Sequence, residues 1–368
     1  MIAQVLQENL TKALNQVGRL IPLRPQLPIL QNLLLTTEEG RLKIIATNLE
    51  TTEILWVGAK IEKEGELCIP AKLFTELVAS LPQEAVFLTE NRESLVVKSQ
   101  GVTATIPGVS AKEFPPIPKS KEKTRSTIKK DEFCVLVGRV SFAAATDEGR
   151  PLLTGIRIKK DDGGVVFAAT DGYRLSVARS TMSVGFSVDL VVPSRALNEV
   201  VKASAEDKNL KELMLAQTED GQLVFGVGDT EIHTRLIDGE YPNFEKIIPR
   251  SFSTRALLDK ERLLRAVKSA AVFARDNANI VRFSLNNQTL LVSANTPQVG
   301  ENKIEVEAKI DGDGGEIAFN SRFLLDFLNN FPDDEVLFEM TGSLNPGVFK
   351  PVKDKSYLHV IMPVRVQA

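Results

Sequence analysis

The sequence contains little cysteine and little histidine, since its 368 residues include two of each. Cys68 and Cys134 lie in apolar surroundings with no cysteine nearby, which is typical of small buried hydrophobic residues in a reducing compartment. The scarcity of both residue types argues against a zinc site built from cysteine and histidine, and it leaves few candidates for a general base near neutral pH. We therefore predict no metal site and no cofactor.

Long apolar runs are also missing. No stretch approaches the roughly 18 residues of a membrane span, and the first 20 residues mix apolar with polar side chains where a signal peptide would be continuously apolar. We therefore expect a cytoplasmic protein without a membrane partner. The net charge of −3 argues against a surface that is basic overall, but 45 Lys and Arg residues can gather on one face. Charge alone does not exclude a nucleic-acid partner.

The chain contains one unit three times, a pattern that decides the fold. Leu10, Phe133 and Leu263 each begin an apolar stripe at i, i+3, i+4 and i+7, which predicts three amphipathic helices spaced 123 and 130 residues apart. A second set of helices follows short apolar strands at spacings of 123 and 127 residues, and its stripes begin at Phe74, Leu197 and Leu324.

The start of each second helix repeats as well. Pro or Asn ends the strand, a small residue follows, and a cation comes next: Lys72, Arg195 or Arg322. A further anchor is the alanine at which a strand between the two helices ends, and these residues are Ala46, Ala169 and Ala294. Three anchors in one order at nearly constant spacing argue against chance resemblance among helices.

These patterns predict the fold class α+β, with three repeated domains of two helices packed on an antiparallel sheet. Short Val-, Ile-, Leu- and Thr-rich segments separated by Gly, Asp or Asn turns supply the strands. We place the domains at residues 1–125, 126–250 and 251–368. Proline- and lysine-rich connectors at 114–130 and proline-rich connectors at 240–249 separate them.

Motifs of catalytic chemistry are weak or absent. No phosphate-binding glycine loop appears, and neither His233 nor His359 has partners spaced as a nucleophilic triad needs, so both are interpreted as ordinary strand residues. Asp311–Glu316 resembles a calcium loop but lacks its remaining ligands, which favours a hairpin tip. Thr170-Asp171-Gly172 is better explained as a turn. Two classes remain: a non-catalytic scaffold that binds macromolecules, which we favour, and an enzyme with a site of scattered carboxylates.

Four segments resemble a known family, the β subunit of bacterial DNA polymerase III, or β sliding clamp. They are Arg24–Leu33, Ala169–Leu175, Asp238–Pro242 and Met362–Arg365. The resemblance covers the whole chain and implies a head-to-tail homodimer whose six domains close into a ring, with helices lining the hole. It also implies a bacterial cytoplasmic protein, associated with the nucleoid during replication. Such a protein encircles duplex DNA without sequence preference, is loaded by an ATP-driven clamp loader and tethers the replicative polymerase and other partners.

DNA-facing residues follow from the repeat and the resemblance together. Lys72, Arg195 and Arg322 occupy one repeated position at a helix start, where a cation and the positive helix end attract phosphate together. The alternative is three solvated cations. Arg24 matches an arginine that contacts DNA in the family. The remaining predicted DNA contacts are Lys12, Arg19, Arg139, Lys202, Lys246 and Arg265.

Subunit closure is predicted from sheet edges. The hairpin of Leu95–Lys98 and Val102–Ile106 ends the first repeat, and the third repeat has no following domain, so each leaves an edge that a second subunit can cover. The resemblance places Val272 and Phe273 near this contact with Ile106 opposite. Ordinary core positions are an equally good explanation of these three residues.

The resemblance also implies a pocket between the second and third repeats for short peptides with leucine or phenylalanine anchors. Its residues would be Arg150, Leu153, Thr170, Gly172, Tyr173, Arg174, Leu175, Pro242, Ile247, Val360, Met362, Pro363, Val364 and Arg365. The alternative is that the apolar members fill a core. Pro151 and Leu152 replace aromatic residues of the family pattern, and Tyr173 stands where histidine is common. These departures weaken a DNA contact at 151–152 and alter hydrogen bonding in the pocket.

Overall fold

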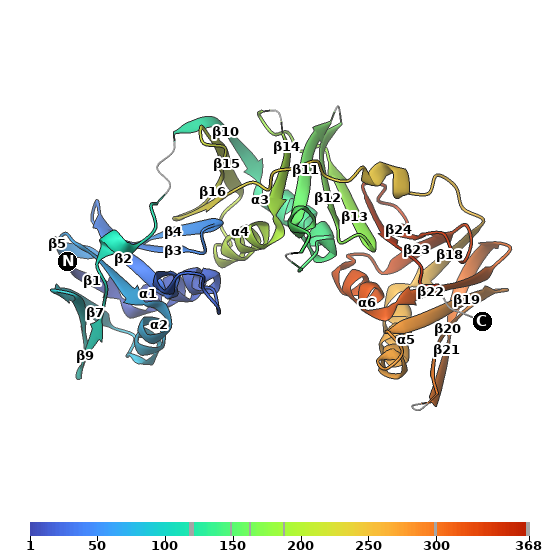
Figure 1. Cartoon of the computed structure of the whole chain (residues 1–368), viewed down its shortest axis with the longest axis horizontal. Coiled ribbons are helices and arrows are strands. Elements are labelled where there is room, and N and C mark those ends of the chain that lie inside the picture. The colour runs from blue at the N-terminus through green and yellow to red at the C-terminus, as the bar shows by residue number, and fades with distance from the viewer. Residues whose placement is uncertain (118–120, 148, 162, 187, 298–299, 366–368) are drawn as a thin grey trace. The chain divides into compact units, whose positions relative to one another are not determined.

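The computed structural model covers the whole chain and describes residues 1–117, 121–147, 149–161, 163–186, 188–297 and 300–365. Within them it contains six α-helices, three matching each predicted set (Figure 1). The first set is α1 (Gln7–Val17), α3 (Lys130–Val140) and α5 (Lys260–Ala274). The second set is α2 (Ala71–Ser80), α4 (Ser194–Glu206) and α6 (Ser321–Asn330). No helix in these residues is long and apolar enough to cross a lipid bilayer.

The predicted apolar stripes face the core. All four stripe residues of α1, α3 and α5 are buried, as the helical period requires when one face packs on a sheet. Each second helix begins directly after a strand: α2 after β6 (Glu66–Pro70), α4 after β14 (Asp189–Pro193) and α6 after β22 (Gly315–Asn320). α1 packs against α2, and α5 against α6 (Figure 1). The predicted helix starts are therefore confirmed.

The chain divides into two compact units. The first consists of residues 1–130 and 195–236. Its five-stranded sheet has the order β5-β1-β7-β8-β9, and its eight-stranded sheet has the order β10-β15-β16-β17-β4-β3-β2-β6. Besides β6, these strands are β1 (Ile2–Leu6), β2 (Asn32–Glu38), β3 (Arg41–Thr47), β4 (Thr51–Gly58), β5 (Lys60–Lys63), β7 (Ala85–Asn91), β8 (Ser94–Ser99), β9 (Val102–Pro107), β10 (Glu122–Lys129), β15 (Glu212–Thr218), β16 (Leu223–Val227) and β17 (Thr230–Thr234).

The second unit consists of residues 131–194 and 237–368. Its strands form one twelve-stranded arrangement, β14-β11-β12-β13-β25-β24-β23-β18-β21-β20-β19-β22. Besides β14 and β22, they are β11 (Gly155–Asp161), β12 (Gly164–Thr170), β13 (Arg174–Ser180), β18 (Thr254–Asp259), β19 (Ile280–Asn286), β20 (Thr289–Thr296), β21 (Gly300–Gly312), β23 (Glu335–Met340), β24 (Gly347–Pro351) and β25 (Tyr357–Ile361). All strand pairs in both units are antiparallel, as predicted.

The two units do not coincide with the three sequence repeats. The second repeat contributes β10, α4 and β15–β17 to the first unit, and most of α3 with β11–β14 to the second. This division arises because strands pair across repeat boundaries: β17 pairs with β4, and β25 pairs with β13. The boundaries 1–125, 126–250 and 251–368 therefore stay predictions based on the repeat.

The segments considered as metal or catalytic sites lie in strands or in a turn between strands. Asp313 and Gly314 link β21 to β22, and the Gly314 carbonyl accepts a hydrogen bond from Thr254 Oγ1 at 2.7 Å. These two strands are not neighbours in the sheet, since β22 pairs with β19, so the segment is a turn but the prediction of a hairpin tip is wrong. His233 lies in β17 and His359 in β25. The described residues hold no group of three or more His, Cys, Asp or Glu side chains placed to bind a metal ion.

Candidate DNA-facing helices and partner pocket

Lys72, Arg195 and Arg322 occupy the same position in three helices. Each is the second residue of its helix, in α2, α4 and α6, and each is exposed. The first backbone N–H groups of a helix have no partner within the helix, so a cation at this position adds to an end that already attracts anions. Lys72 is 89% exposed and lies 3.9 Å from Glu76, one turn further along α2. The geometry suits transient phosphate contacts.

Several other predicted cations also lie on exposed surface. Lys12 on α1 donates to the carbonyl of Glu206 at 3.1 Å. Lys202 on α4 is paired with Glu199 at 2.7 Å. The remaining three exposed cations are Arg265 on α5, Arg24 in the bend before Pro28 and Lys246 in the short 3-10 helix Phe244–Ile247.

Arg139 and Arg19 are held by protein groups. The Arg139 guanidinium pairs with Asp354 at 2.9 Å, and its side chain is 16% exposed beside the ring of Tyr357. Arg19 pairs with Glu199 at 3.1 Å. Both side chains are also less exposed, at 27% for Arg19 and 16% for Arg139, than the paired Lys202 at 53%, so we do not include them among the residues proposed below to touch phosphate.

Ten of the fourteen predicted pocket residues surround a single pocket of about 200 Å³ in the second unit. They are Leu153, Thr170, Gly172, Tyr173, Arg174, Leu175, Pro242, Ile247, Val360 and Met362. Two further residues, Asn243 and Phe244, complete the lining. No sequence pattern singles out these two residues, because Glu240–Pro249 has the composition of a connector and composition does not show which of its side chains face inward.

The turn between β12 and β13 forms one wall of this pocket. Asp171 Oδ1 accepts hydrogen bonds from the backbone N–H groups of Tyr173 at 2.9 Å and Arg174 at 3.0 Å. Gly172 has φ +90°, a conformation that favours glycine, and a Cβ there would lie 3.2 Å from Arg150 Nη1. Arg150 therefore stands at the pocket margin, exposed to solvent.

Arg174 supports the wall and does not reach outward. Its guanidinium pairs with Asp171 at 3.0 Å and with Asp326 of α6 at 2.6 Å, and it lies 4.7 Å from the ring centre of Phe323. Its side chain is 9% exposed. Tyr173, by contrast, is 59% exposed, and its ring stacks on Phe323. Tyr173 is thus the aromatic side chain of this lining that is open to solvent.

The floor is fixed from behind by Tyr241. The backbone N–H of Thr170 donates to Tyr241 Oη at 3.2 Å, and burial raises the pKa of this phenol well above its ordinary value. Tyr241 and Phe244 pack with Leu175 and Val360 in one apolar cluster. The connector thereby becomes part of the pocket's framework.

Pro363, Val364 and Arg365 follow β25 but do not line the pocket. The N–H of Met362 donates to the Tyr173 carbonyl at 2.8 Å, and the N–H of Val364 donates to the Ala318 carbonyl at 2.8 Å. The second bond attaches the C-terminal segment to β22. Pro363 and Val364 are half-buried and Arg365 is exposed.

The three predicted interface residues differ in environment. Val272 on α5 is 55% exposed and Phe273 is half-buried. Ile106 on β9 is 2% exposed and belongs to the core of the first repeat. The Ile106 side chain therefore packs inside its own repeat. Any contact of β9 with a second subunit would be made by the backbone and the exposed residues of β9.

Comparisons with known proteins agree along the whole chain. Family models described as the DNA polymerase III beta subunit match with the N-terminal domain at residues 1–118, the central domain at 127–243 and the C-terminal domain at 245–365. The beta sliding clamp of Synechococcus elongatus is 32% identical over 98% of each chain, and that of Chlamydia muridarum is 28% identical over 98% of each.

Solved structures agree with this result. The DNA polymerase sliding clamp from Bacillus subtilis superposes with a TM-score of 0.92 at 24% identity, covering 100% of both chains. The C. crescentus beta sliding clamp, solved with polyethylene glycol bound to a putative beta-motif tethering region, gives 0.91 at 26% identity, also over 100% of both chains. The chain has the sliding-clamp fold and belongs to the DNA polymerase III β subunit family, the bacterial β sliding clamps.

Proposed function

We propose that two copies of this chain close into a ring around duplex DNA and hold replication proteins there. The family is that of a non-enzymatic DNA sliding clamp of replication. A clamp loader that uses ATP would open the ring, and the replicative polymerase and other partners would bind through short peptide motifs. The bacterial family implies a cytoplasmic protein, which we expect at the nucleoid while DNA is replicated.

The pairing of strands between successive repeats carries this proposal. It occurs twice within the chain, and the two strands that would form it a third time do not pair with each other among the described residues. The last strand of the second repeat, β17, pairs with β4 of the first, and β25 of the third repeat pairs with β13 of the second. The equivalent strands β9 and β21 remain. β9 is the edge of its sheet in the described structure, and residues 300–307 of β21 pair with β20 alone among the described strands. A second copy supplies the missing partner to each edge.

The position of Val272 supports the same junction. Counting from the end of each apolar stripe, Val272 corresponds to Arg19 and Phe142. Arg19 pairs with Glu199 of the following repeat, and the Phe142 ring centre lies 5.3 Å from that of His359 in the repeat after its own. Both equivalents thus contact the next repeat, whereas Val272 is exposed. A partner subunit would cover it.

DNA would be held by phosphate contacts that carry no sequence information. The exposed helix-start residues Lys72, Arg195 and Arg322 would occur twice in a dimer, and Lys12, Arg24, Lys202, Lys246 and Arg265 would add to them. Contacts of this kind weaken steeply with salt and permit movement along the duplex. That behaviour suits a sliding ring.

The pocket near Tyr173 suits the peptide motifs of partners. Leu153, Leu175 and Val360 give apolar walls for leucine or phenylalanine anchors, and the flexible Met362 side chain adapts to different guests. Polymerase, clamp loader and repair proteins would then compete for one pocket.

Retention on DNA of different topology tests the ring. The protein is loaded onto nicked circular plasmid with its host's clamp loader and ATP, then filtered through a sizing column in 0.5 M NaCl. We expect it to stay with circular plasmid and to be released when a restriction enzyme linearises the plasmid, because a ring slides off an end. Equal retention on circular and linear plasmid would contradict the proposal.

A further inference from the structure

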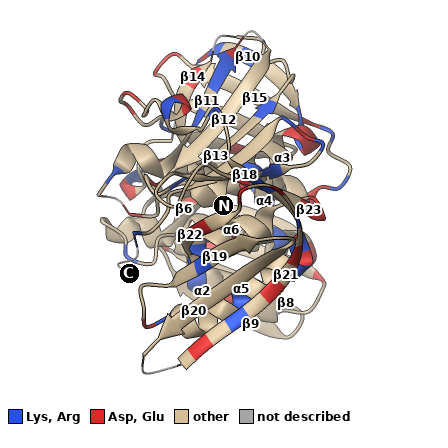
Figure 2. Cartoon of the chain, turned by 90° about the vertical axis from the view of Figure 1, so that its right-hand side faces the viewer, with Lys and Arg blue, Asp and Glu red and all other residues tan. Residues whose placement is uncertain are grey.

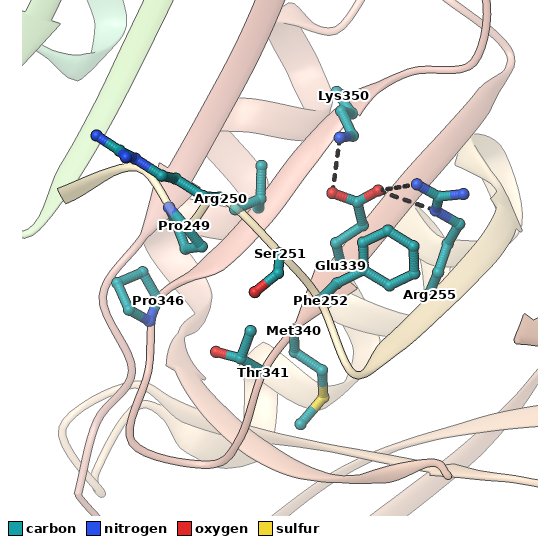
Figure 3. Close-up of a pocket in the computed structure, with 11 residues that line it drawn as sticks. Pro249, Arg250, Ser251, Phe252, Arg255, Glu339, Met340, Thr341, Pro346 and Lys350 are labelled. Atoms are coloured by element: carbon teal, nitrogen blue, oxygen red, sulfur yellow. Dashed lines mark hydrogen bonds and ion pairs between the residues drawn. The ribbon is translucent and has the colours of Figure 1, made fainter. Parts of the chain in front are cut away.

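A second pocket of about 250 Å³ lies in the third repeat, on the sheet formed by β18, β23 and β24 (Figure 3). Along β18, Ala256 and Leu258 are buried in the core, whereas Arg255 faces the opposite side. Along β23, Phe338 packs with the aromatic core, and the neighbouring Glu339 again points the other way. The pocket is therefore on the sheet face turned away from that core.

The floor of this pocket is an ion cluster with excess positive charge. The Glu339 side chain is 8% exposed; its Oε1 accepts from Arg255 Nε at 2.9 Å and Nη2 at 2.7 Å, and its Oε2 lies 2.6 Å from Lys350 Nζ (Figure 3). The Arg255 guanidinium lies 3.9 Å from the ring centre of Phe252, which fixes its plane. One carboxylate faces two cations whose side chains are 37% and 33% exposed, so N–H groups remain for an external anion.

This pocket adjoins the one near Tyr173. Val348 lines the pocket with the ion cluster, and Val360 lines the pocket near Tyr173. The two residues are direct cross-strand partners, so their side chains share one face of the sheet. The connector borders both: Ile247 lines one pocket and Pro249 the other. Two residues of chain span at most about 7 Å. A peptide a few residues longer than the apolar motif can therefore reach both.

We propose that this pocket, defined by Phe252, Arg255, Glu339, Val348 and Lys350, is an acidic-residue subsite for the same peptides. The inference rests on the proposed function, because the occupant is the continuation of the peptide whose apolar anchors fill the pocket near Tyr173. Continuity with that pocket and the excess positive charge specify the occupant: Asp or Glu residues flanking the apolar anchors. Such residues raise affinity and select among partners that share the same anchors.

The test uses fluorescein-labelled peptides with one leucine–phenylalanine anchor and a flank of three Glu or three Gln residues, placed at either end. In 50 mM NaCl we expect one Glu-flanked peptide to bind about five- to tenfold more tightly than its Gln-flanked counterpart. The advantage should disappear in Arg255→Gln/Lys350→Gln and persist in Arg262→Gln, which breaks an exposed ion pair with Glu307 elsewhere in the same repeat. The subsite would be overturned if the Glu-flanked and Gln-flanked peptides bound equally whichever end carried the flank. It would also be overturned if the advantage of the Glu flank survived in the double variant.

A variant that should raise the affinity controls for misfolding, because a misfolded protein would lose affinity. Glu339→Gln removes the internal carboxylate and leaves both cations for the peptide, so the Glu-flanked peptide should bind more tightly than to wild type. Methyl-labelled valine separates the two sites: Val360 reports the pocket near Tyr173 and Val348 the new one. A Val360 signal that moves with neither peptide contradicts the proposed function. Because Val348 and Val360 are neighbours, the readout is the difference between peptides: a Val348 shift that is no larger with the Glu-flanked than with the Gln-flanked peptide contradicts this subsite.

Discussion

Glu53 is a buried carboxylate at the junction of β4 with β17. It is 1% exposed; its Oε1 accepts from Gln16 Nε2 at 2.8 Å, and its Oε2 has no hydrogen-bond partner among the described residues. Burial, the largest influence, raises the pKa of Glu53 above its ordinary value, while the bond from Gln16 opposes the rise. Burial therefore disfavours the ionised form of the Glu53 carboxyl group.

The sign of the resulting pH dependence follows from linkage. Because the folded pKa lies above the unfolded one, this group's stabilisation is complete below the unfolded pKa of about 4.5 and is lost as pH rises through the folded pKa. Each unit of difference corresponds to about 1.4 kcal/mol. We therefore expect Glu53→Gln to raise Tm relative to wild type more at pH 8 than at pH 4.5. Glu62→Gln, which removes a carboxylate at an exposed position on β5, is the matched control. A Glu53→Gln effect independent of pH would contradict the assignment.

Among helices and strands, the sequence predicted regular features and missed packing between distant segments. The stripe from Leu10 to Val17 and the Pro193-Ser194-Arg195 start predicted α1 and α4 because helix periodicity and strand breakers are local. The lining role of Phe244 depends on how the connector folds back onto β12 and β25, which no local pattern encodes. Local patterns likewise do not show that Asp354, distant in sequence, pairs with Arg139.

The three helix starts permit a prediction that separates DNA contact from general surface charge. Charge reversal in Lys72→Glu/Arg195→Glu places carboxylates beside phosphate, so loading and clamp-dependent DNA synthesis should fall at least tenfold at moderate salt, with the dimer retained. Lys60→Glu/Lys63→Glu, on the exposed strand β5, changes charge equally and should leave synthesis unchanged. Primer-extension assays with polymerase and loader give the readout. Unchanged synthesis with the first pair would remove the helix starts from the DNA-facing surface.

At the scale of the whole molecule, the repeat predicts how a second subunit pairs. Ser176 on β13 pairs with His359 on β25, and their side chains are joined by a 2.6 Å contact between Oγ and Nδ1. Glu53 on β4 lies opposite Ile232 on β17 in the equivalent strand pair. The residue equivalent to Glu53 and Ser176 on β21 is Asn302, because each lies opposite the repeated alanine of the preceding strand. Along this edge β21 also carries a charged residue at every second position, three of them acidic and one a lysine from Glu301 to Glu307 (Figure 2).

The matching position on β9 is Ala104, because it pairs with Val97 as Ile232 pairs with Phe225 and His359 with Phe349. The repeat therefore places Ala104 of one subunit opposite Asn302 of the other. Asn302 Oδ1 is buried without a hydrogen-bond partner among the described residues, although Nδ2 reaches Ser269 Oγ at 3.4 Å. A subunit packed on this edge could supply the missing donor.

Disulfide trapping tests this register. Directly opposed residues of an antiparallel pair have Cβ atoms about 4.5–5.5 Å apart, close enough to be joined with slight adjustment. In a Cys134→Ser background, Ala104→Cys/Asn302→Cys should oxidise to a covalent dimer of twice the 40.4 kDa chain on a non-reducing gel. Native Cys68 should not interfere, since burial raises the pKa of its thiol to about 12. Thr103→Cys/Asn302→Cys, shifted by one residue so that the side chains lie on opposite faces, should remain monomeric on the same gel. Efficient trapping of the shifted pair, or failure of the matched pair while gel filtration still shows a dimer, would mean that the subunits do not repeat the junctions within the chain.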